Sequence, residues 1–184
     1  WCKKERRITI FSSPHNTMLK IGLLSDTHAT LPPRVLTHFQ EVDEIWHAGD
    51  IGSIAVADQL ETFKPLRMVY GNIDGAELRI RYPEHLVFTI EKVKILMMHI
   101  GGYPPRYNPE AKKLLDLHRP DIFICGHSHI LKVMPDAQRN LLHINPGACG
   151  HSGWHKKNTI LRFHVDNDRL RDLEVIEWDR SARE

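Results

Sequence analysis

The sequence predicts an α/β fold, because strand-like apolar runs alternate with helical patterns through the first half of the chain. Short apolar runs lie at residues 19–24, 42–46 and 66–70, and the segments between them carry apolar residues at helical spacing. This β-α-β-α-β order predicts a largely parallel sheet covered by helices. In the second half, strand-like runs follow one another with a single helical interruption, which predicts mostly antiparallel pairing.

Two helices are expected to connect the first three strands. The first begins at Pro32-Pro33, since proline is tolerated in the first turn of a helix, and includes Phe39. The second follows Ser53, whose hydroxyl suits the N-cap position, and ends before Pro65 breaks the chain.

The second half begins with a predicted hairpin, in which residues 86–90 and 93–99 flank a Glu91-Lys92 turn. A helix is expected at residues 110–118, followed by a strand at residues 121–125. Further strands are expected at residues 131–134, 141–144, 160–165 and 170–176, the last two joined by a turn at residues 166–168.

One domain is expected at residues 18–184, because the chain of 184 residues is long enough for one substantial core and too short for two of ordinary size. Residues 1–17 are expected to be an N-terminal extension outside the fold, since basic residues, a brief apolar patch and a loop-like segment precede the first strand. The patch is too short for a secretory signal. No apolar run approaches the roughly 18 residues that cross a membrane, so no membrane partner is expected.

The charge pattern gives no sign of a nucleic-acid binder. The formal net charge is +2, and the basic residues are scattered along the chain rather than gathered into a stripe. No binding to long nucleic acid is therefore expected. The three cysteines, Cys2, Cys125 and Cys149, form no C-x-x-C pair, which favours a reduced, cytoplasmic protein.

Short polar clusters follow the apolar runs, each at a predicted strand end. They are Asp26-Thr27-His28, Gly49-Asp50, Gly71-Asn72, His99 and Gly126-His127-Ser128-His129. Side chains at the carboxyl ends of parallel strands converge above the sheet, so these donors are expected to meet. Asp26 and His28 lie two residues apart and would point to the same side of an extended segment. Singly, each cluster also fits a helix cap, a turn or a buried histidine; five in one chain favour a metal site.

The chemistry of the donors indicates two divalent metal ions. A nitrogen and oxygen set without thiolate suits Mn²⁺, Fe²⁺, Ni²⁺ or Zn²⁺ better than Mg²⁺ or Ca²⁺. The Asp50 carboxylate can bridge two ions. Such a pair lowers the pKa of a bridging water and holds both oxygens of an in-line displacement at phosphorus, which predicts phosphoester hydrolysis with a metal-bridging hydroxide as nucleophile.

In this order, the clusters resemble the calcineurin-like metallophosphoesterase superfamily, and closely its small single-domain bacterial and archaeal phosphodiesterase branch, which is related to the retromer subunit Vps29. The resemblance implies a four-layer sandwich of two mixed β-sheets flanked by helices, with a dinuclear site at the sheet edge. It implies that the substrate is a phosphodiester and that Mn²⁺ or Ni²⁺ is the preferred metal, with Zn²⁺ or Fe²⁺ as further candidates.

The resemblance also implies how the ligands divide. One ion would be held by Asp26, His28, Asp50 and His129, and the other by Asp50, Asn72, His99 and His127. Asp50 would bridge the two ions, and we expect Asp50 and Asn72 to be the catalytic residues.

Two positions depart from the superfamily pattern. Ile73 stands where many members carry a histidine that stabilises the phosphoryl oxygens or protonates the leaving group. General acid catalysis contributes about 10²–10⁴-fold, so a preference for good leaving groups is predicted. After His99, relatives usually read His-Gly-His, whereas this chain continues Ile100-Gly101-Gly102.

Several neighbouring residues are candidates for supporting the ligands. His47 precedes Gly49-Asp50 and either orients a metal ligand or has a packing role. Asp74 and Asn145 are further candidates, although Asn145-Pro146-Gly147 also fits an ordinary turn. The polar loop with His151, Trp154 and His155 either touches substrate or faces water, and the solvated interpretation is preferred.

Three functions are compatible with such a chain. The first is a phosphoesterase acting on a small phosphodiester, with nucleotide-derived diesters among the candidates. The second is a Vps29-like protein-interaction module, which has no physical reason to keep seven competent metal donors converging on one point. The third, a nuclease, would need a basic groove with stacking aromatics, which the sequence does not show clearly. A homo-oligomer is also expected, partly from apolar residues near Trp154 and Trp178 that look exposed.

Overall fold

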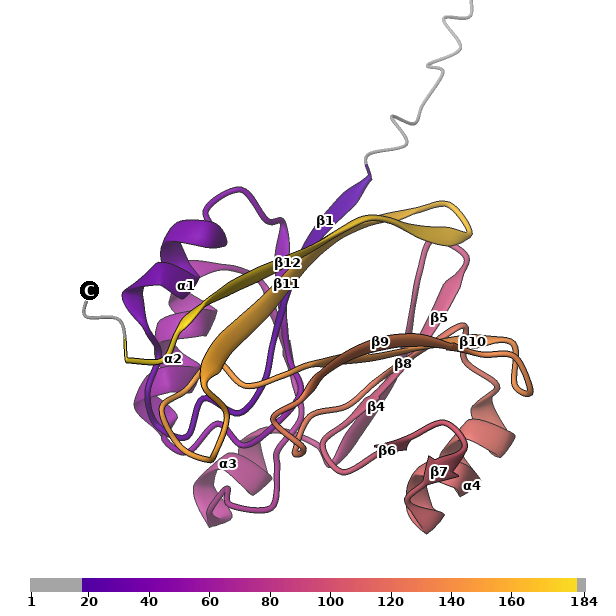
Figure 1. The fold of residues 1–184 in the computed structure, drawn as a ribbon, viewed down its shortest axis with the longest axis horizontal. Coiled ribbons are helices and arrows are strands. Elements are labelled where there is room, and N and C mark those ends of the chain that lie inside the picture. The colour runs from indigo at the N-terminus through magenta and orange to yellow at the C-terminus, as the bar shows by residue number, and fades with distance from the viewer. Residues whose placement is uncertain (1–17, 182–184) are drawn as a thin grey trace, which may run out of the picture.

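The computed structural model describes residues 18–181, which form two five-stranded sheets packed face to face and a separate two-stranded hairpin (Figure 1). The helices are α1 (Pro33–His38), α2 (Ile54–Phe63), α3 (Ala76–Arg81) and α4 (Pro109–His118). The strands are β1 (Leu19–Leu24), β2 (Glu44–His47), β3 (Leu66–Met68), β4 (His85–Ile90), β5 (Val93–Met98), β6 (Gly102–Tyr103), β7 (Arg106–Tyr107), β8 (Ile122–Ile124), β9 (Leu131–Asp136), β10 (Leu141–Pro146), β11 (Lys157–Asp166) and β12 (Arg169–Asp179).

The first sheet has the strand order β12-β11-β1-β2-β3. Its β1, β2 and β3 are parallel, as the sequence predicts, with Ile21 opposite Glu44 and Ile45 opposite Leu66. The long β11 then returns antiparallel to β1, so the end of the chain completes a sheet that its beginning started. This arrangement brings the loops after β1, β2 and β3 to one edge.

The second sheet has the order β4-β5-β8-β10-β9 and is mixed. Most pairings after residue 85 are antiparallel, as the sequence predicts, but β8 runs parallel to both β5 and β10. The physical reason is α4, which carries the chain back across the sheet between β5 and β8, as parallel strands require. The loops after β5 and β8 therefore also share an edge.

Three hydrophobic clusters fill the gaps between four layers. Alternating residues of one strand serve different clusters, since Leu23 packs between the two sheets while Leu24 packs under α1 and α2. On β8, Ile124 lies between the sheets and Phe123 packs against α4. Figure 1 shows α1, α2 and α3 grouped on the side of the first sheet and α4 on that of the second. The predicted four-layer sandwich is thus confirmed.

Some features differ from the sequence predictions. The helix α3 and the β6–β7 hairpin were not expected. The Trp178 side chain is only 9% exposed and belongs to the cluster beneath α1 and α2, so its expected exposure is wrong. The homo-oligomer stays a prediction.

The extension predicted at residues 1–17, which includes Cys2, lies outside the described residues. The single-domain boundary at residue 18 stays a prediction. Cys125 and Cys149 are buried and unpaired. Among the helices of residues 18–181, none combines the length and the apolar character that crossing a membrane requires.

Candidate metal centre

The predicted ligands come together in two groups at the edge where the strands end. The first group is Asp26, His28 and His129, and the second is Asp50, His99 and His127. Within each group the donor atoms lie within 4.8 Å of one another. The family resemblance implies the same partition of these six residues, while Asp50 as a shared ligand and Asn72 as a further ligand stay predictions.

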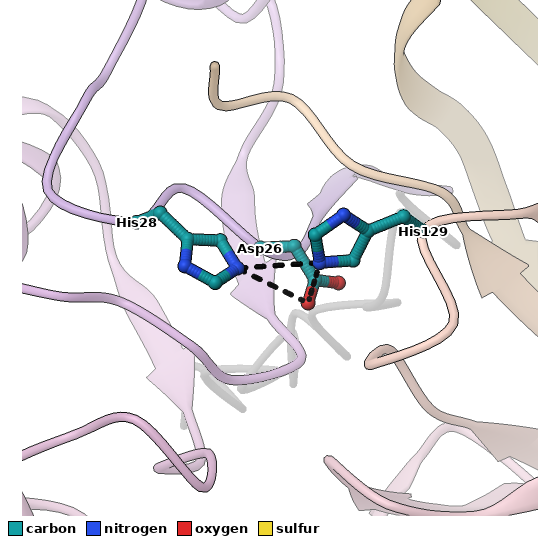
Figure 2. Close-up of side chains that lie close together, drawn as sticks. All are labelled: Asp26, His28 and His129. Atoms are coloured by element: carbon teal, nitrogen blue, oxygen red, sulfur yellow. Dashed lines mark hydrogen bonds and ion pairs between the residues drawn. The ribbon is translucent and has the colours of Figure 1, made fainter. Parts of the chain in front are cut away.

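In the first group, three side chains from distant parts of the chain point toward one another (Figure 2). Nε2 of His129 lies 3.2 Å from Oδ1 of Asp26 and 3.2 Å from Nε2 of His28. The nearby Asp26 carboxylate raises the pKa of His129, and this effect outweighs burial, which lowers it. The surroundings of His129 therefore favour a positive charge.

In the second group, the imidazole of His99 is fixed from both sides. Nδ1 donates a hydrogen bond to the backbone carbonyl oxygen of Ala48 at 2.8 Å, and Nε2 lies 3.1 Å from Oδ1 of Asp50. Because the carbonyl only accepts, Nδ1 keeps its proton and Nε2 is the nitrogen that can bind an ion. The exposed ring of His127 lies edge-on to His99, with 5.3 Å between the ring centroids.

Asp50 stands between the groups. Its Oδ1 faces His99 and also accepts the backbone N–H of Ile73 at 3.1 Å, whereas Oδ2 lies 3.6 Å from Nε2 of His28. Burial raises the pKa of Asp50, but His99, the Ile73 N–H and His28 lower it further than burial raises it. The carboxylate is therefore charged, with one oxygen directed at each group.

Asn72, the remaining predicted ligand, is exposed beside the second group. It lines a cavity of about 170 Å³ together with His99, Tyr70 and Arg79. The Arg79 guanidinium donates to the carbonyl oxygens of Gly71 (3.1 Å) and Asn72 (3.2 Å), which holds this loop against α3. Asn72 therefore borders the centre from a loop whose backbone is anchored.

His47 ties together the loops that follow β1 and β2. Its Nδ1 accepts the N–H of Gly49 at 3.1 Å, so the proton of the neutral ring is on Nε2, which donates to Thr27 Oγ1 at 2.9 Å. The Thr27 hydroxyl in turn donates a hydrogen bond to the carbonyl oxygen of Ile51 at 2.9 Å. Full burial lowers the pKa of His47 to about 4, which keeps the ring neutral. The buried ring thus holds the residues next to Asp26 and Asp50.

Asp74 ties together the loops that follow β2 and β3. Its Oδ1 accepts the N–H of Gly52 at 2.7 Å, while Oδ2 accepts those of Gly71 at 2.7 Å and Ile51 at 3.1 Å. Three charge-assisted bonds from two loops fix the backbone on either side of Asp50 and Asn72.

Asn145 holds the loop that carries His127 and His129. Its side-chain amide donates to the carbonyl oxygen of Gly126 at 2.7 Å and to Ser128 Oγ at 3.1 Å. Its own oxygen accepts the Gly147 N–H at 2.9 Å, so the turn-forming and loop-holding interpretations both apply.

The donor set fits divalent metal ions. Oδ1 of Asp26 and Nε2 of His99 are buried, and neither has a hydrogen-bond partner within residues 18–181. Buried polar atoms without partners are costly, so both atoms suit a ligand that supplies positive charge. The imidazoles and carboxylates, with no thiolate among them, are the ligand types of first-row divalent ions.

The sequence comparison decides the family. Residues 19–168 match the calcineurin-like phosphoesterase superfamily domain. The chain belongs to this superfamily. The resemblance inferred from the motif order is thereby confirmed, and the protein is related to metallophosphoesterases along almost its entire described length.

Archaeal members of the superfamily are similar to this chain in sequence. A probable metallophosphoesterase of Methanothermobacter thermautotrophicus is 32% identical over 85% of this chain and 91% of its own length. A phosphodiesterase of Methanocaldococcus jannaschii is 27% identical over 71% of this chain and 84% of its own length.

Solved structures show that the fold is shared more widely. Vps29 of Entamoeba histolytica, solved with Zn²⁺, aligns with a TM-score of 0.69 at 18% identity, covering 89% of this chain and all of that one. An archaeal phosphodiesterase aligns with a TM-score of 0.67 at 23% identity, covering 86% of this chain and all of that one. At these identities the likeness concerns the fold.

The backbone of the ligand loops corrects one sequence-based argument. Asp26 and His28 do not share an extended segment, because both have positive φ values (56° and 45°). Positive φ also occurs at Asp50, His127 and His129. Such conformations are uncommon for residues other than glycine and cluster at functional sites. The pairing of Asp26 with His28 is therefore set by tight turns held from outside, for which the sequence carries no direct signal.

Proposed function

We propose that this protein is a phosphodiesterase that acts through two divalent metal ions bridged by Asp50. The observation that carries this proposal is the orientation of the Asp50 carboxylate, whose oxygens lie 3.1 Å from His99 Nε2 and 3.6 Å from His28 Nε2. A buried carboxylate with one oxygen toward each of two ligand groups suits a bridging role.

The ligands divide between the two ions as their grouping suggests. Asp26, His28 and His129 would hold one ion together with Asp50, and Asn72, His99 and His127 would hold the other with Asp50. Two such ions would supply Lewis acidity for the activation of water and for charge on the phosphoryl group. Mn²⁺ or Ni²⁺ is the preferred metal of this proposal, and Zn²⁺ or Fe²⁺ also suits the donors.

The protein's own contribution is to hold these donors in place before substrate arrives. Asp74 and His47 fix the loops around Asp50, and Asn145 fixes the loop that carries His127 and His129. Because a misplacement of about 1 Å can cost 10²-fold in rate, anchoring from buried polar side chains matters as much as the ligands themselves.

The leaving group receives no help at the position where many superfamily members carry a histidine. Ile73 occupies that position, its apolar side chain is 47% exposed, and its backbone N–H is used by Asp50. A leaving group must therefore depart without a proton from this residue. Substrates with acidic leaving groups are expected to react fastest.

A phosphodiester is favoured over a monoester because the M. jannaschii relative is a phosphodiesterase. The natural substrate of this proposal is small and nucleotide-derived. The Vps29 neighbours share the fold at low identity, which does not distinguish a phosphodiesterase from a protein-interaction module. An interaction module would gain nothing from burying Asp26 and Asp50 beside four histidines, since buried charge is costly.

Hydrolysis by metal-reconstituted protein tests the proposal. Phosphomonoesters and phosphodiesters with leaving groups of graded pKa are assayed with Mn²⁺, Ni²⁺, Zn²⁺ and Fe²⁺. Asp50→Asn is the test variant, and Asp168→Asn, which alters an exposed turn carboxylate, is its control. Phosphodiester hydrolysis that depends on metal and is lost only in Asp50→Asn supports the proposal. No hydrolysis with any metal, or an Asp50→Asn variant as active as the parent, refutes it.

A further inference from the structure

A cavity of about 460 Å³ opens directly beside the candidate metal centre. Its wall includes His127 and His129, one from each group of candidate ligands, together with Ile130, Trp154 and His155. A substituent esterified to a phosphoryl group at the metals can therefore extend into this cavity.

Two large apolar side chains in the wall of the cavity are exposed. The Trp154 indole is fully exposed, with a relative accessibility of 101%, and the neighbouring Ile130 is 63% exposed. Large apolar side chains exposed around a cavity mark a site where something else binds. Here the site adjoins the candidate metal centre, so part of a substrate held at the metals can reach it.

Trp154 is presented by an anchored loop. On one side of it, the carbonyl oxygen of Gly153 accepts a hydrogen bond from Arg180 Nη1 at 2.5 Å. On the other side, Nε2 of His155 donates to the carbonyl oxygen of Gly150 at 3.1 Å. The loop also packs closely on the candidate ligand His129, since a Cβ atom added at Gly153 would lie 2.3 Å from its Nδ1. A surface held in this way binds with a smaller entropic cost than a mobile one.

We infer that Trp154 is the stacking surface of a nucleobase subsite, and that the substrate is a phosphoester bearing a nucleoside. This inference rests on the proposed function. An exposed indole offers a flat face of the kind on which bases stack, and such stacking strengthens binding about tenfold or more. The cavity is larger than a single phenyl ring needs and has the Ser128 hydroxyl and the His155 imidazole in its wall for the polar edge of a base.

Equilibrium binding of two matched phosphoesters tests this subsite. Mn²⁺-loaded protein is titrated with adenosine 5′-monophosphate and with ribose 5-phosphate, which lacks the base, by calorimetry. The parent is expected to bind adenosine 5′-monophosphate at least about fivefold more tightly. Trp154→Ala is expected to bring the ratio of the two Kd values close to one, while Trp154→Phe keeps part of the preference.

The control variant is Leu117→Ala, which removes another exposed apolar side chain (73%) on α4 and should keep the parent ratio. Melting temperatures of all variants should equal that of the parent, since both altered side chains are exposed. The subsite is refuted if the parent binds both compounds equally, if it binds neither, or if Trp154→Ala keeps the parent ratio.

A hydrolysis assay on the same samples separates this inference from the proposed function. A Trp154-dependent preference for adenosine 5′-monophosphate without any hydrolysis would support the subsite and refute the phosphodiesterase. Hydrolysis with no preference for the nucleotide would leave the phosphodiesterase standing and refute the subsite.

Discussion

Nε2 of His99 lies 3.1 Å from Oδ1 of Asp50, so a buried imidazole faces a buried carboxylate. Burial lowers the pKa of His99, but Asp50 and the nearby Asp26 raise it further, and the net effect is a raised pKa. The surroundings of His99 therefore favour a positive charge at Nε2, and a metal ion that binds there competes with a proton.

Metal binding is accordingly expected to release protons. At a pH of about 6.5, where an ordinary histidine is half protonated, the raised pKa values mean that His99 and His129 are each protonated in more than half of the metal-free molecules. Calorimetric titration with Mn²⁺ in buffers of different ionisation enthalpy measures the release, and affinity should fall as the pH falls. A binding enthalpy independent of the buffer would contradict this expectation.

Asp74→Asn is expected to weaken metal binding although it removes no proposed ligand. An amide has one acceptor oxygen, so either the bond from Gly52 or the bonds from Gly71 and Ile51 are lost. Residues that support metal ligands typically contribute about 10–100-fold to affinity or activity, and a loss in this range is predicted. The Kd for Mn²⁺ is the measurement, with Asp168→Asn as the control, and equal affinities for the two variants would show that Asp74 does not support the centre.

Gly71→Ala tests how closely the loops pack around Asp50. A Cβ atom at this position would lie 2.1 Å from Oδ1 of Asp50, so the carboxylate must move. A displacement of about 1 Å should lower phosphodiester hydrolysis by about 100-fold. Gly75→Ala is the matched control, because a Cβ there meets nothing within 4 Å and the residue has a negative φ. Similar activities of the two variants would count against the crowded centre.

Acid is expected to destabilise the fold through two buried histidines. Burial lowers the pKa of both His47 and His143 to about 4. Their neutral forms contribute full stability above about pH 6.5, and this contribution declines as the pH falls toward 4, because the unfolded chain takes up the protons first. Each histidine should cost about 1 kcal/mol per pH unit in this window. Denaturant unfolding of the parent and of His143→Gln at several pH values measures how the free energy of unfolding changes with pH. This change should be smaller in the variant, and equal changes would contradict the assignment.

The identity of the candidate ligands could be predicted from the sequence because polar residues interrupt apolar strands at fixed places. The loop geometry could not. Asp26 and Asp50 have positive φ in loops that His47 and Asp74 hold partly through distant partners, Thr27 at 20 residues and Ile51 at 23 residues along the chain. No local pattern encodes such bonds.

Two features of the fold escaped prediction for other physical reasons. The helix α3 has only six residues, and its N-cap, Gly75, makes no side-chain capping bond, so the usual start signal is missing. Trp178 lies near the end of β12, at the edge of the first sheet. Its burial depends on which face of that edge the helices cover, and this is decided by the tertiary arrangement.

The number of ions that bind and the activity that they produce test the central claim most directly. Mn²⁺ is added stepwise to metal-free protein, and bound Mn²⁺ and hydrolysis of bis(4-nitrophenyl) phosphate are measured in the same samples. We predict that two ions bind per chain and that activity requires both. Asp50→Asn should lose the second ion and hydrolysis. Full activity with one ion or none, or an Asp50→Asn variant that still binds two ions and hydrolyses the diester, would contradict it.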